Sequence, residues 1–223
     1  AGQLSHDFNN LLTIIIGSIE VVMEDMPAQS VNLKLAQGML QASRESAELI
    51  KQLLIFARRQ EYTPKIAVPN EAVAEARERL NKLPGPRYEL DCRLAPELAR
   101  VNLDPEQLTQ ALIDIVMNAR DAMPAGGTIK ITTHNQCVPE DSESGIKAGD
   151  YAVVEVSDSG PGLTPEALEH LFEPFFSTKP KGKGAGLGLP AVYGIIKQHK
   201  GELIVESHPG RGSVFRIYLP KAV

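Results

Sequence analysis

Two long stretches with apolar residues at three- and four-residue steps fill the first quarter of the chain, and Pro27 separates them. This spacing predicts amphipathic helices over residues 3–26 and 31–60. The proline ends the first helix because it cannot continue the backbone hydrogen bonding. A two-helix hairpin cannot cover its own apolar stripe, so we expect it to pair with a second copy in a four-helix bundle. Packing of the stripe against the rest of the same chain is the alternative.

The polar face of the first helix carries a histidine. At about 100° per residue, His6 and Asn10 fall opposite the apolar face that begins with Phe8, and Asp7 directly follows His6. A neighbouring carboxylate can hold one ring nitrogen and accept its proton, which makes the imidazole a candidate nucleophile. An ordinary surface histidine is the alternative. The nucleophile interpretation is favoured only if another part of the chain binds an electrophilic substrate for His6.

The sequence pattern changes near residue 62. Residues 61–70 contain two prolines and predict a linker with one short strand, after which short strand-like and helical segments are mixed. The expected helices cover residues 70–82, 104–123 and 187–199, with a short helix after Asp158, and the expected strands cover residues 88–94, 99–103, 128–138, 151–158, 202–207 and 213–220. Residues 139–150 predict a solvated polar insertion. This order predicts an α+β chain, in which a helical hairpin precedes an α/β sandwich with helices on one face of a mixed sheet.

Composition excludes several classes of protein. Hydrophobic residues at 43% and charged residues at 23% are typical of a soluble protein with a core. The formal charge of −5 and the scattered basic residues disfavour nucleic-acid binding. No apolar run reaches the length of a membrane span, and Cys92 and Cys137 lack metal-ligand spacing. We therefore expect a cytoplasmic fragment without membrane contact, whose missing upstream region could anchor the parent protein.

The predicted helix after Asp104 carries a polar stripe. Its members are Gln107, Gln110, Asp114, Asn118 and Asp121, while Leu108, Leu112, Ile115, Ala119 and Met123 lie on the other side. A solvated outer face is the ordinary interpretation of such a stripe. However, Asp114 and Asn118 have no charge partner four residues on, and their short oxygen-bearing side chains suit a hard cation such as Mg²⁺.

Three glycine-containing segments point to a phosphate-bearing ligand. DSGPG follows a predicted strand at Asp158, where a carboxylate can accept a hydrogen bond from an exocyclic amine. KPKGKGAGLGLP leads into a helix and offers free N–H groups, with lysines such as Lys179 to offset phosphate charge. It is neither a Walker loop nor a Rossmann fingerprint. HPGRGS is a turn between the last two strands, and a plain hairpin turn is its alternative.

Together these segments resemble, in order and spacing, the sensor histidine kinases of two-component systems. SHDFNNLL resembles the phosphoacceptor box of the FNNLL variety, and LIDIVMNARDAM the N box. DSGPG resembles the first glycine box, LFEPFFSTK the F box, GKGAGLGLP the second glycine box and GRGSVF the last one. The resemblance covers nearly the whole chain. It implies a dimerisation and histidine phosphotransfer hairpin over residues 1–62 and a Bergerat-type catalytic ATP-binding domain over residues 63–223.

The resemblance also implies roles for individual residues. His6 would be the phosphoacceptor, Asp7 the acid that orients and deprotonates it, and Asn10 the residue that positions a water when such kinases dephosphorylate their partner. Asn118 and Asp114 would bind Mg²⁺. The ATP-binding set would be Asp114, Asn118, Asp121, Asp158, Gly160, Gly162, Phe176, Thr178, Lys179, Gly184, Gly186, Leu187, Gly188, Gly212 and Ser213. The implied activity is autophosphorylation by ATP, phosphotransfer to an aspartate of a response-regulator receiver domain, and phosphatase activity toward that partner, in a homodimer.

One position departs from the family pattern. The N box usually has asparagine four residues before the Mg²⁺ ligand, and Asp114 stands there in this chain. Related gyrase-like and Hsp90-like ATPases place an acidic general base at that position. Two rival functions therefore stay open beside the kinase, namely an ATPase of that kind and a non-catalytic nucleotide-binding scaffold.

Overall fold

The computed structural model describes residues 14–23, 26–27, 30–41, 43, 62–82, 88–140, 142, 145–179 and 186–222. The chain divides into two compact units, Ala1–Gln60 and Glu61–Val223. His6, Asp7, Asn10 and Gly184 lie outside the described residues.

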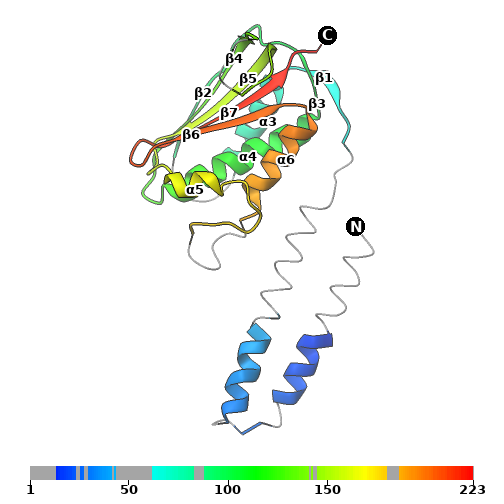
Figure 1. The fold of residues 1–223 in the computed structure, drawn as a ribbon, viewed down its shortest axis with the longest axis vertical. Coiled ribbons are helices and arrows are strands. Elements are labelled where there is room, and N and C mark those ends of the chain that lie inside the picture. Colours follow the sequence, from blue (N-terminus) through cyan, green and yellow to red (C-terminus); the bar gives the residue numbers. More distant parts are fainter. Residues whose placement is uncertain are drawn as a thin grey trace. The chain divides into compact units, whose positions relative to one another are not determined.

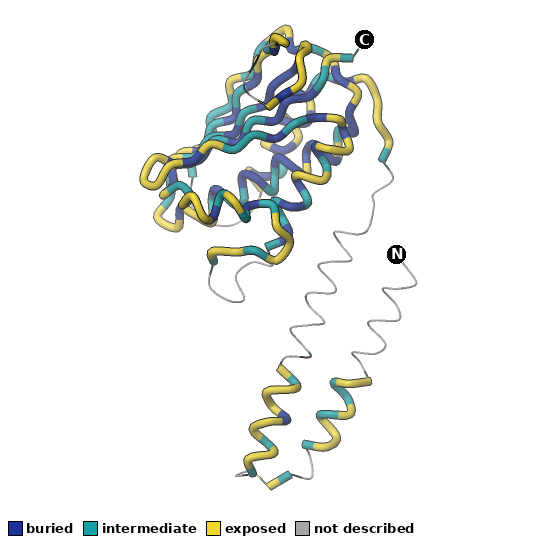
Figure 2. Tube along the Cα trace, in the orientation of Figure 1, coloured by how far each residue is buried: buried dark blue, intermediate teal, exposed yellow. Residues whose placement is uncertain are grey.

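In the first unit, residues 14–23 and 31–41 are helical on either side of Pro27, as the apolar spacing predicts. Many apolar side chains in these helices are exposed, and Figure 2 shows both helices as largely exposed within the unit. Those with 60% or more of their surface exposed are Ile14, Val21, Val31, Leu35 and Met39. The described part of this unit therefore leaves much apolar surface uncovered.

The second unit contains a five-stranded mixed sheet with the order β2-β4-β5-β7-β6. Strand β2 pairs parallel with β4, and every other neighbouring pair is antiparallel. The strands are β2 (Glu89–Arg93), β4 (Thr128–Val138), β5 (Gly149–Asp158), β6 (Glu202–Ser207) and β7 (Ser213–Pro220). A separate antiparallel pair joins β1 (Lys65–Ala67) to β3 (Val101–Leu103).

Three helices cover one face of this sheet: α3 (Pro69–Asn81), α4 (Pro105–Ala122) and α6 (Gly188–Gln198). Helix α4 is central, because it packs against both α3 and α6, and the short helix α5 (Pro165–Glu169) lies beyond β5 in the chain. Figure 1 shows this two-layer arrangement. The predicted α+β class, with helices on one face of a mixed sheet, is confirmed.

The core lies between α4 and the sheet. Leu112, Ile115 and Val116 of α4 and Ile129 and Ile131 of β4 have no exposed surface. Figure 2 shows the buried positions concentrated in α4 and the central strands. Burial of each such side chain contributes about 1.5–3 kcal/mol, so this layer holds α4 rigidly against the sheet.

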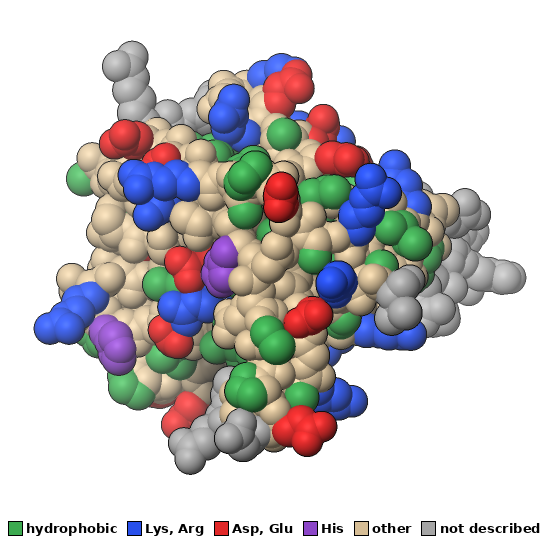
Figure 3. All heavy atoms as spheres, turned by 90° about the horizontal axis from the view of Figure 1, so that it is seen from above, with side chains coloured by type: hydrophobic (Ala, Val, Ile, Leu, Met, Phe, Trp, Pro, Cys, Tyr) green, Lys and Arg blue, Asp and Glu red, His purple; other side chains and the backbone are tan. Residues whose placement is uncertain are grey.

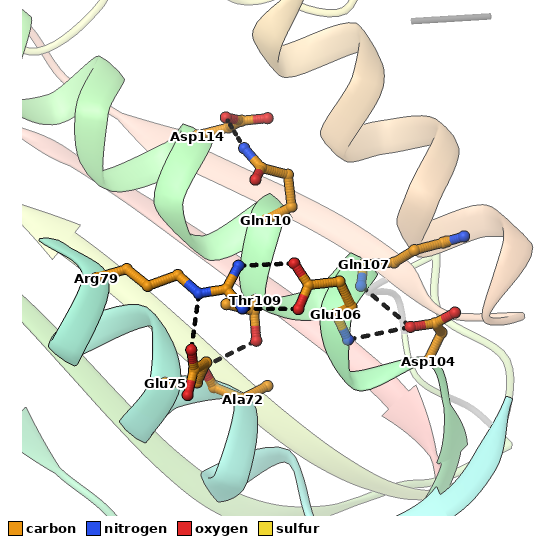
Figure 4. Close-up of polar contacts among 9 residues, drawn as sticks. All are labelled: Ala72, Glu75, Arg79, Asp104, Glu106, Gln107, Thr109, Gln110 and Asp114. Atoms are coloured by element: carbon orange, nitrogen blue, oxygen red, sulfur yellow. Dashed lines mark hydrogen bonds and ion pairs between the residues drawn. The ribbon is translucent and has the colours of Figure 1, made fainter. Parts of the chain in front are cut away.

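Polar contacts fix both the start of α4 and its position beside α3. The Asp104 side chain caps the helix by accepting the N–H groups of Glu106 at 3.0 Å and Gln107 at 3.2 Å. Arg79 of α3 donates two hydrogen bonds to the Glu106 carboxylate, at 2.6 and 2.8 Å. Thr109 donates to the Ala72 carbonyl at 3.4 Å (Figure 4). Because both side chains of the Arg79–Glu106 pair are exposed, water screens the pair and it adds little to stability.

The structure adds detail to two sequence interpretations. The insertion over residues 139–150 is mostly exposed at its described positions, as predicted, but Ile146 is buried against Tyr151 on the sheet face opposite the helices, and the Tyr151 hydroxyl donates to the Lys147 carbonyl at 2.8 Å. On the polar stripe of α4, Gln107 is only 6% exposed, so the alternative of a solvated outer face does not hold at this residue. Helical periodicity assigns a residue to one side of the helix but does not show that a neighbouring helix covers that side.

The surface carries charges of both signs. On the face seen in Figure 3, Lys and Arg side chains are interspersed with Asp and Glu. Among the described residues, no helix combines the length and apolar character that crossing a bilayer requires.

Candidate functional site

The second half of α4 carries the first cluster of polar residues. The Lys179 ammonium donates to the Asp121 carboxylate at 2.8 Å and to the Asn118 amide oxygen at 3.4 Å. Lys179 follows α5 in the chain, about sixty residues after α4, so only the fold brings these groups together. Both oxygens are therefore turned toward a positive charge supplied by the chain itself.

Asp114 lies one helical turn before Asn118 and is partly buried. It accepts a hydrogen bond from the Gln110 amide at 2.9 Å (Figure 4). Burial raises the pKa of the Asp114 carboxyl to about 6, and the hydrogen bond from Gln110 only partly opposes this shift. A carboxyl with this pKa can exchange a proton near neutral pH.

The second cluster surrounds Asp158 at the end of β5. One carboxylate oxygen of Asp158 accepts the Gly160 N–H at 2.8 Å. Burial raises the pKa of Asp158, while hydrogen bonds from the Gly160 and Ser213 N–H groups and from the Ser213 hydroxyl oppose the shift. Gly160 itself is buried, and a Cβ there would lie 2.7 Å from the Asp158 carboxylate oxygen.

Two glycines let the β6–β7 turn approach the Asp158 segment at backbone distance. Gly212 has φ +77°, and a Cβ there would lie 1.9 Å from the Asp158 carbonyl oxygen. Gly162 has φ +71°, and its Cβ would lie 2.1 Å from the His208 carbonyl oxygen. Both positions therefore require glycine, for conformation and for space.

Ser207 supports this turn, although we did not predict it as part of the site. Its hydroxyl donates to the Gly212 carbonyl at 2.9 Å and accepts the Leu163 N–H at 2.8 Å. It also lies 3.0 Å from the Ser213 hydroxyl. The sequence signal was weak, because a serine that ends a strand is common.

The segment before α6 returns to α4. The Phe175 N–H donates to the Gly186 carbonyl at 3.0 Å, and both residues have positive φ, of 70° and 65°. A Cβ on Gly186 would lie 2.4 Å from the Phe176 carbonyl oxygen, whereas a Cβ on Gly188 would lie 3.4 Å from the Asn118 amide nitrogen. The start of α6 is thus held close to the Asn118 side chain.

Met123 joins the two clusters. It is the C-cap residue of α4, and its sulfur accepts a hydrogen bond from the Ser159 hydroxyl at 3.6 Å. A Cβ on Gly160 would lie 3.2 Å from the Met123 side chain. The sequence assigned Met123 to the apolar side of α4, which is confirmed, but the sequence does not show its contact with the Asp158 turn.

The structure therefore brings most of the predicted site residues into two adjoining groups. The first group comprises Asn118 and Asp121 of α4 and Gly188 of α6, together with Lys179 from the segment after α5. Asp158, Gly160, Gly162, Gly212 and Ser213 form the group at the strand ends. Phe176 contacts Gly186 and the His170 ring, whose centroid is 5.5 Å away. Leu187 is buried, and Thr178 is exposed.

This arrangement is shared with known proteins. The family model "Histidine kinase-, DNA gyrase B-, and HSP90-like ATPase" matches residues 103–223. The chain is 38% identical over its whole length to the sensor kinase CckA of Brucella abortus (strain 2308), of which it covers 24%. It is 32% identical over 99% of its length to the sensor histidine kinase ZraS of Salmonella typhimurium (strain LT2), of which it covers 45%. The chain thus spans less than half of either relative.

A solved structure shows the same fold over nearly the whole chain. A crystal structure of the histidine kinase ThkA in complex with the response regulator protein TrrA matches with a TM-score of 0.57 and 24% identity. The match covers 99% of this chain and 60% of that one. These comparisons confirm the resemblance to sensor histidine kinases that the sequence motifs indicate. Because the family model matches more than half of its residues, the chain belongs to the histidine kinase-, DNA gyrase B- and HSP90-like ATPases.

Proposed function

We propose that this chain is the transmitter part of a sensor histidine kinase, which phosphorylates itself on His6 and passes the phosphoryl group to a receiver aspartate. Residues 1–62 would be the dimerisation and phosphotransfer hairpin, and residues 63–223 the catalytic ATP-binding domain. The observation that carries the proposal is the pair of adjoining groups at Asn118 and Asp158. They lie in an ATPase family fold, on a chain that also carries the His6-Asp7 pair.

The Asp158 group is suited to the base of ATP. One carboxylate oxygen is engaged by Gly160, and the other can accept a hydrogen bond from the exocyclic amine of adenine. Gly212 and Gly162 keep side chains out of the surrounding backbone, so the carboxylate is held by main-chain atoms. This rigidity supports a role for Asp158 as the adenine-reading residue.

The α4 group is suited to the phosphates and to Mg²⁺. Asn118 and Asp121 already face a cation, the Lys179 ammonium, which supports the fit of this site to a positive ion. Mg²⁺ prefers oxygen ligands and retains several waters, so few protein ligands are needed, and Asn118 and Asp114 would supply them. A bound Mg²⁺ would neutralise charge on the phosphates. Lys179 and the backbone N–H groups before α6 would contact the phosphate oxygens directly.

The proposed reaction at His6 is a nucleophilic displacement at phosphorus. The imidazole nitrogen of His6 attacks the γ-phosphorus, a P–N bond forms, and the P–O bond to ADP breaks. The proton lost by the ring passes to the Asp7 carboxylate. Catalysis rests mainly on positioning and charge neutralisation. The phosphoryl group then moves to a carboxylate of the receiver domain as the P–N bond breaks. Asn10 would position a water that hydrolyses the resulting aspartyl phosphate to free phosphate.

The exposed apolar side chains of the hairpin support homodimer formation. Val31, Leu35 and Met39 follow one another at four-residue steps on one helix and are 60–73% exposed in the single chain. Such a stripe is buried when two hairpins form a four-helix bundle. The structure of ThkA in complex with a response regulator supports a receiver domain as the second partner of this chain.

The decisive experiment uses purified chain, ATP labelled at the γ-phosphate, and Mg²⁺. Label that is acid-labile, alkali-stable and absent from His6→Ala supports the proposal. Asp158→Asn should lose nucleotide binding and label together, while His6→Ala should keep nucleotide binding and lose only the label. Label that persists in His6→Ala would contradict the assignment of His6, and failure of the wild-type chain to bind ATP would contradict the whole proposal.

ATP hydrolysis is a second candidate function, which the environment of Asp114 favours. Its pKa of about 6 is that of a general base able to accept a proton from an attacking water near neutral pH. The water oxygen would bond to the γ-phosphorus, ADP would leave, and Asp114 would take the proton. In this role Asp114 would not be a Mg²⁺ ligand. In a His6→Ala background, Asp114→Asn should therefore abolish slow phosphate release while nucleotide still binds. Unchanged release would exclude this role.

A further inference from the structure

The segment that enters the second unit is held by a single carboxylate. The Thr63 N–H and hydroxyl both donate to one oxygen of Asp104, at 2.9 and 3.2 Å. The other oxygen of Asp104 caps α4 through the N–H groups of Glu106 and Gln107. Asp104 is only 4% exposed, so these contacts are largely shielded from water. One side chain thus holds both the entering chain and the start of α4.

His199, the C-cap residue of α6, completes this arrangement. Its Nε2 accepts the Asp104 N–H at 2.8 Å, and its Nδ1 lies 2.7 Å from the Ile195 carbonyl oxygen. Because a backbone N–H can only donate, Nε2 must be unprotonated and Nδ1 must carry the hydrogen. His199 is 5% exposed, and the Tyr62 ring meets it edge-on with centroids 5.2 Å apart. We call Tyr62, Thr63, Asp104 and His199 the linker clamp.

The electrostatics of the clamp favour a charged Asp104. Burial opposes ionisation of Asp104, but hydrogen bonds from Thr63, Gln107 and Glu106 prevail and lower its pKa. Burial and the nearby Asp104 charge raise the pKa of the Tyr62 hydroxyl. The carboxylate therefore stays ionised and bonded in the folded chain, and residues 62 and 63 move with the second unit.

The linker clamp and the proposed nucleotide site lie at opposite ends of the same two helices. Asp104 begins α4, and Asn118 lies fourteen residues later, roughly 21 Å along the axis. His199 ends α6, and Gly188 begins it. Since His199 contacts Asp104 while Gly188 approaches Asn118, the helices run antiparallel and are joined at both ends. The two helices also pack against each other, so they form a continuous connection between the linker clamp and the proposed nucleotide site.

We propose that the linker clamp couples the entering segment at Tyr62 and Thr63 to the nucleotide site through the α4–α6 pair. A shift of the entering segment changes the Asp104 and His199 contacts, and the helix pair passes that change to Asn118 and Gly188. Coupling is reciprocal. If the clamp contacts raise the affinity for nucleotide by some factor, bound nucleotide must stabilise those contacts by the same factor. The inference rests on the proposed function only in taking Asn118 and Asp158 as the ATP site.

Hydrogen exchange tests the reciprocity in the whole chain. The Thr63 and Asp104 amides are measured with and without a non-hydrolysable ATP analogue and Mg²⁺. We expect the analogue to slow exchange at both amides by about threefold or more, within the range of ordinary coupling free energies. The Leu219 amide, in the buried strand β7, serves as an internal reference for global stability. Bound analogue with unchanged exchange at Thr63 and Asp104 would overturn the coupling.

Variants of the linker clamp test whether its contacts affect nucleotide binding. His199→Phe keeps a ring beside Tyr62 but removes the acceptor for the Asp104 N–H, and Thr63→Val removes only one hydroxyl. We expect both to weaken analogue binding, by about fivefold for His199→Phe, although neither residue lies in the site. Thr132→Val, on the outer sheet face, is the matched control and should bind as wild type. If His199→Phe does not fold, Thr63→Val still decides, because affinity equal to wild type in that folded variant would overturn the proposal. A wild-type chain that binds no analogue would instead contradict the proposed function.

Discussion

The ammonium of Lys179 lies 2.8 Å from the carboxylate of Asp121, and the same group reaches the Asn118 amide oxygen at 3.4 Å. One side chain of the F box is thus joined to two side chains of the N box. The Lys179 ammonium therefore lies where we propose that the negatively charged phosphates of ATP bind. An ammonium has three N–H donors, so Lys179 can keep its contact with Asp121 and also reach a phosphate oxygen.

Lys179→Met should weaken nucleotide binding about tenfold, since a hydrogen bond from a charged donor contributes about 1.5–3 kcal/mol. Binding should also depend less on ionic strength in this variant. Calorimetric titration at two salt concentrations measures both effects. Lys147→Met, which removes an exposed lysine from the β4–β5 loop, is the control. If Lys179→Met binds nucleotide as tightly as wild type, Lys179 contacts the α4 side chains but does not contribute to nucleotide binding.

Gly212→Ala should disrupt the site far more than Gly210→Ala, although both glycines have φ near +78°. A Cβ at 210 meets nothing within 4 Å, so this variant should lose only about 1 kcal/mol of stability from the left-handed conformation. A Cβ at 212 meets the Asp158 carbonyl oxygen at 1.9 Å and must displace the turn. Urea unfolding and nucleotide titration of both variants would separate strain from steric displacement, and equal losses would contradict this explanation.

Asp114→Asn should stabilise the metal-free chain at pH 7.5 but not at pH 3.5. The folded-state pKa of about 6 lies above the ordinary value of 3.8, so the folded chain binds an extra proton between these values. Stability of the wild type therefore falls as pH rises from about 4 to 6, and the loss persists above that range. Removing the charge should recover on the order of 2 kcal/mol at pH 7.5, measured by urea unfolding in EDTA. A gain that is the same at both pH values would show that the ionised carboxylate is not the cause.

Leu35→Glu should convert the dimer to monomer, because it places a charge within the apolar stripe that we expect the second copy to cover. Lys34→Glu, at the adjacent exposed position, should leave the dimer intact. Sedimentation velocity distinguishes the two species. A wild-type chain that sediments as a monomer at micromolar concentration would count against the bundle.

The sequence predicted helix α4 almost completely because the signals that define it are local. Asp104 and Pro105 mark its start, and Leu108, Leu112 and Ile115 mark its buried side, so the predicted span of 104–123 matches the observed Pro105–Ala122. The strands β4, β6 and β7 were predicted at their observed limits for the same reason. Alternation and flanking turn residues are properties of neighbouring residues.

The contacts that complete the site could not be predicted in this way. Thr63 bonds Asp104 across 41 residues, and Lys179 bonds Asn118 across 61. The sequence placed Gln107 on the polar stripe of α4 but could not show that it is buried, because periodicity in one helix does not show where another element packs. His199 was not predicted as part of any contact network, since only the fold reveals that both of its ring nitrogens are engaged.

The close approach of Gly212 and Gly162 to neighbouring carbonyl groups affects how this surface can change over evolutionary time. Main-chain atoms and the Ser207 and Ser213 hydroxyls hold the turn around Asp158, and the positions of these atoms do not depend on the side chains at neighbouring exposed sites. Substitutions at exposed positions such as Pro161 or Arg211 can therefore accumulate without moving the carboxylate. The chain can acquire different surface chemistry around an unchanged base-reading group, provided that the two glycines are kept.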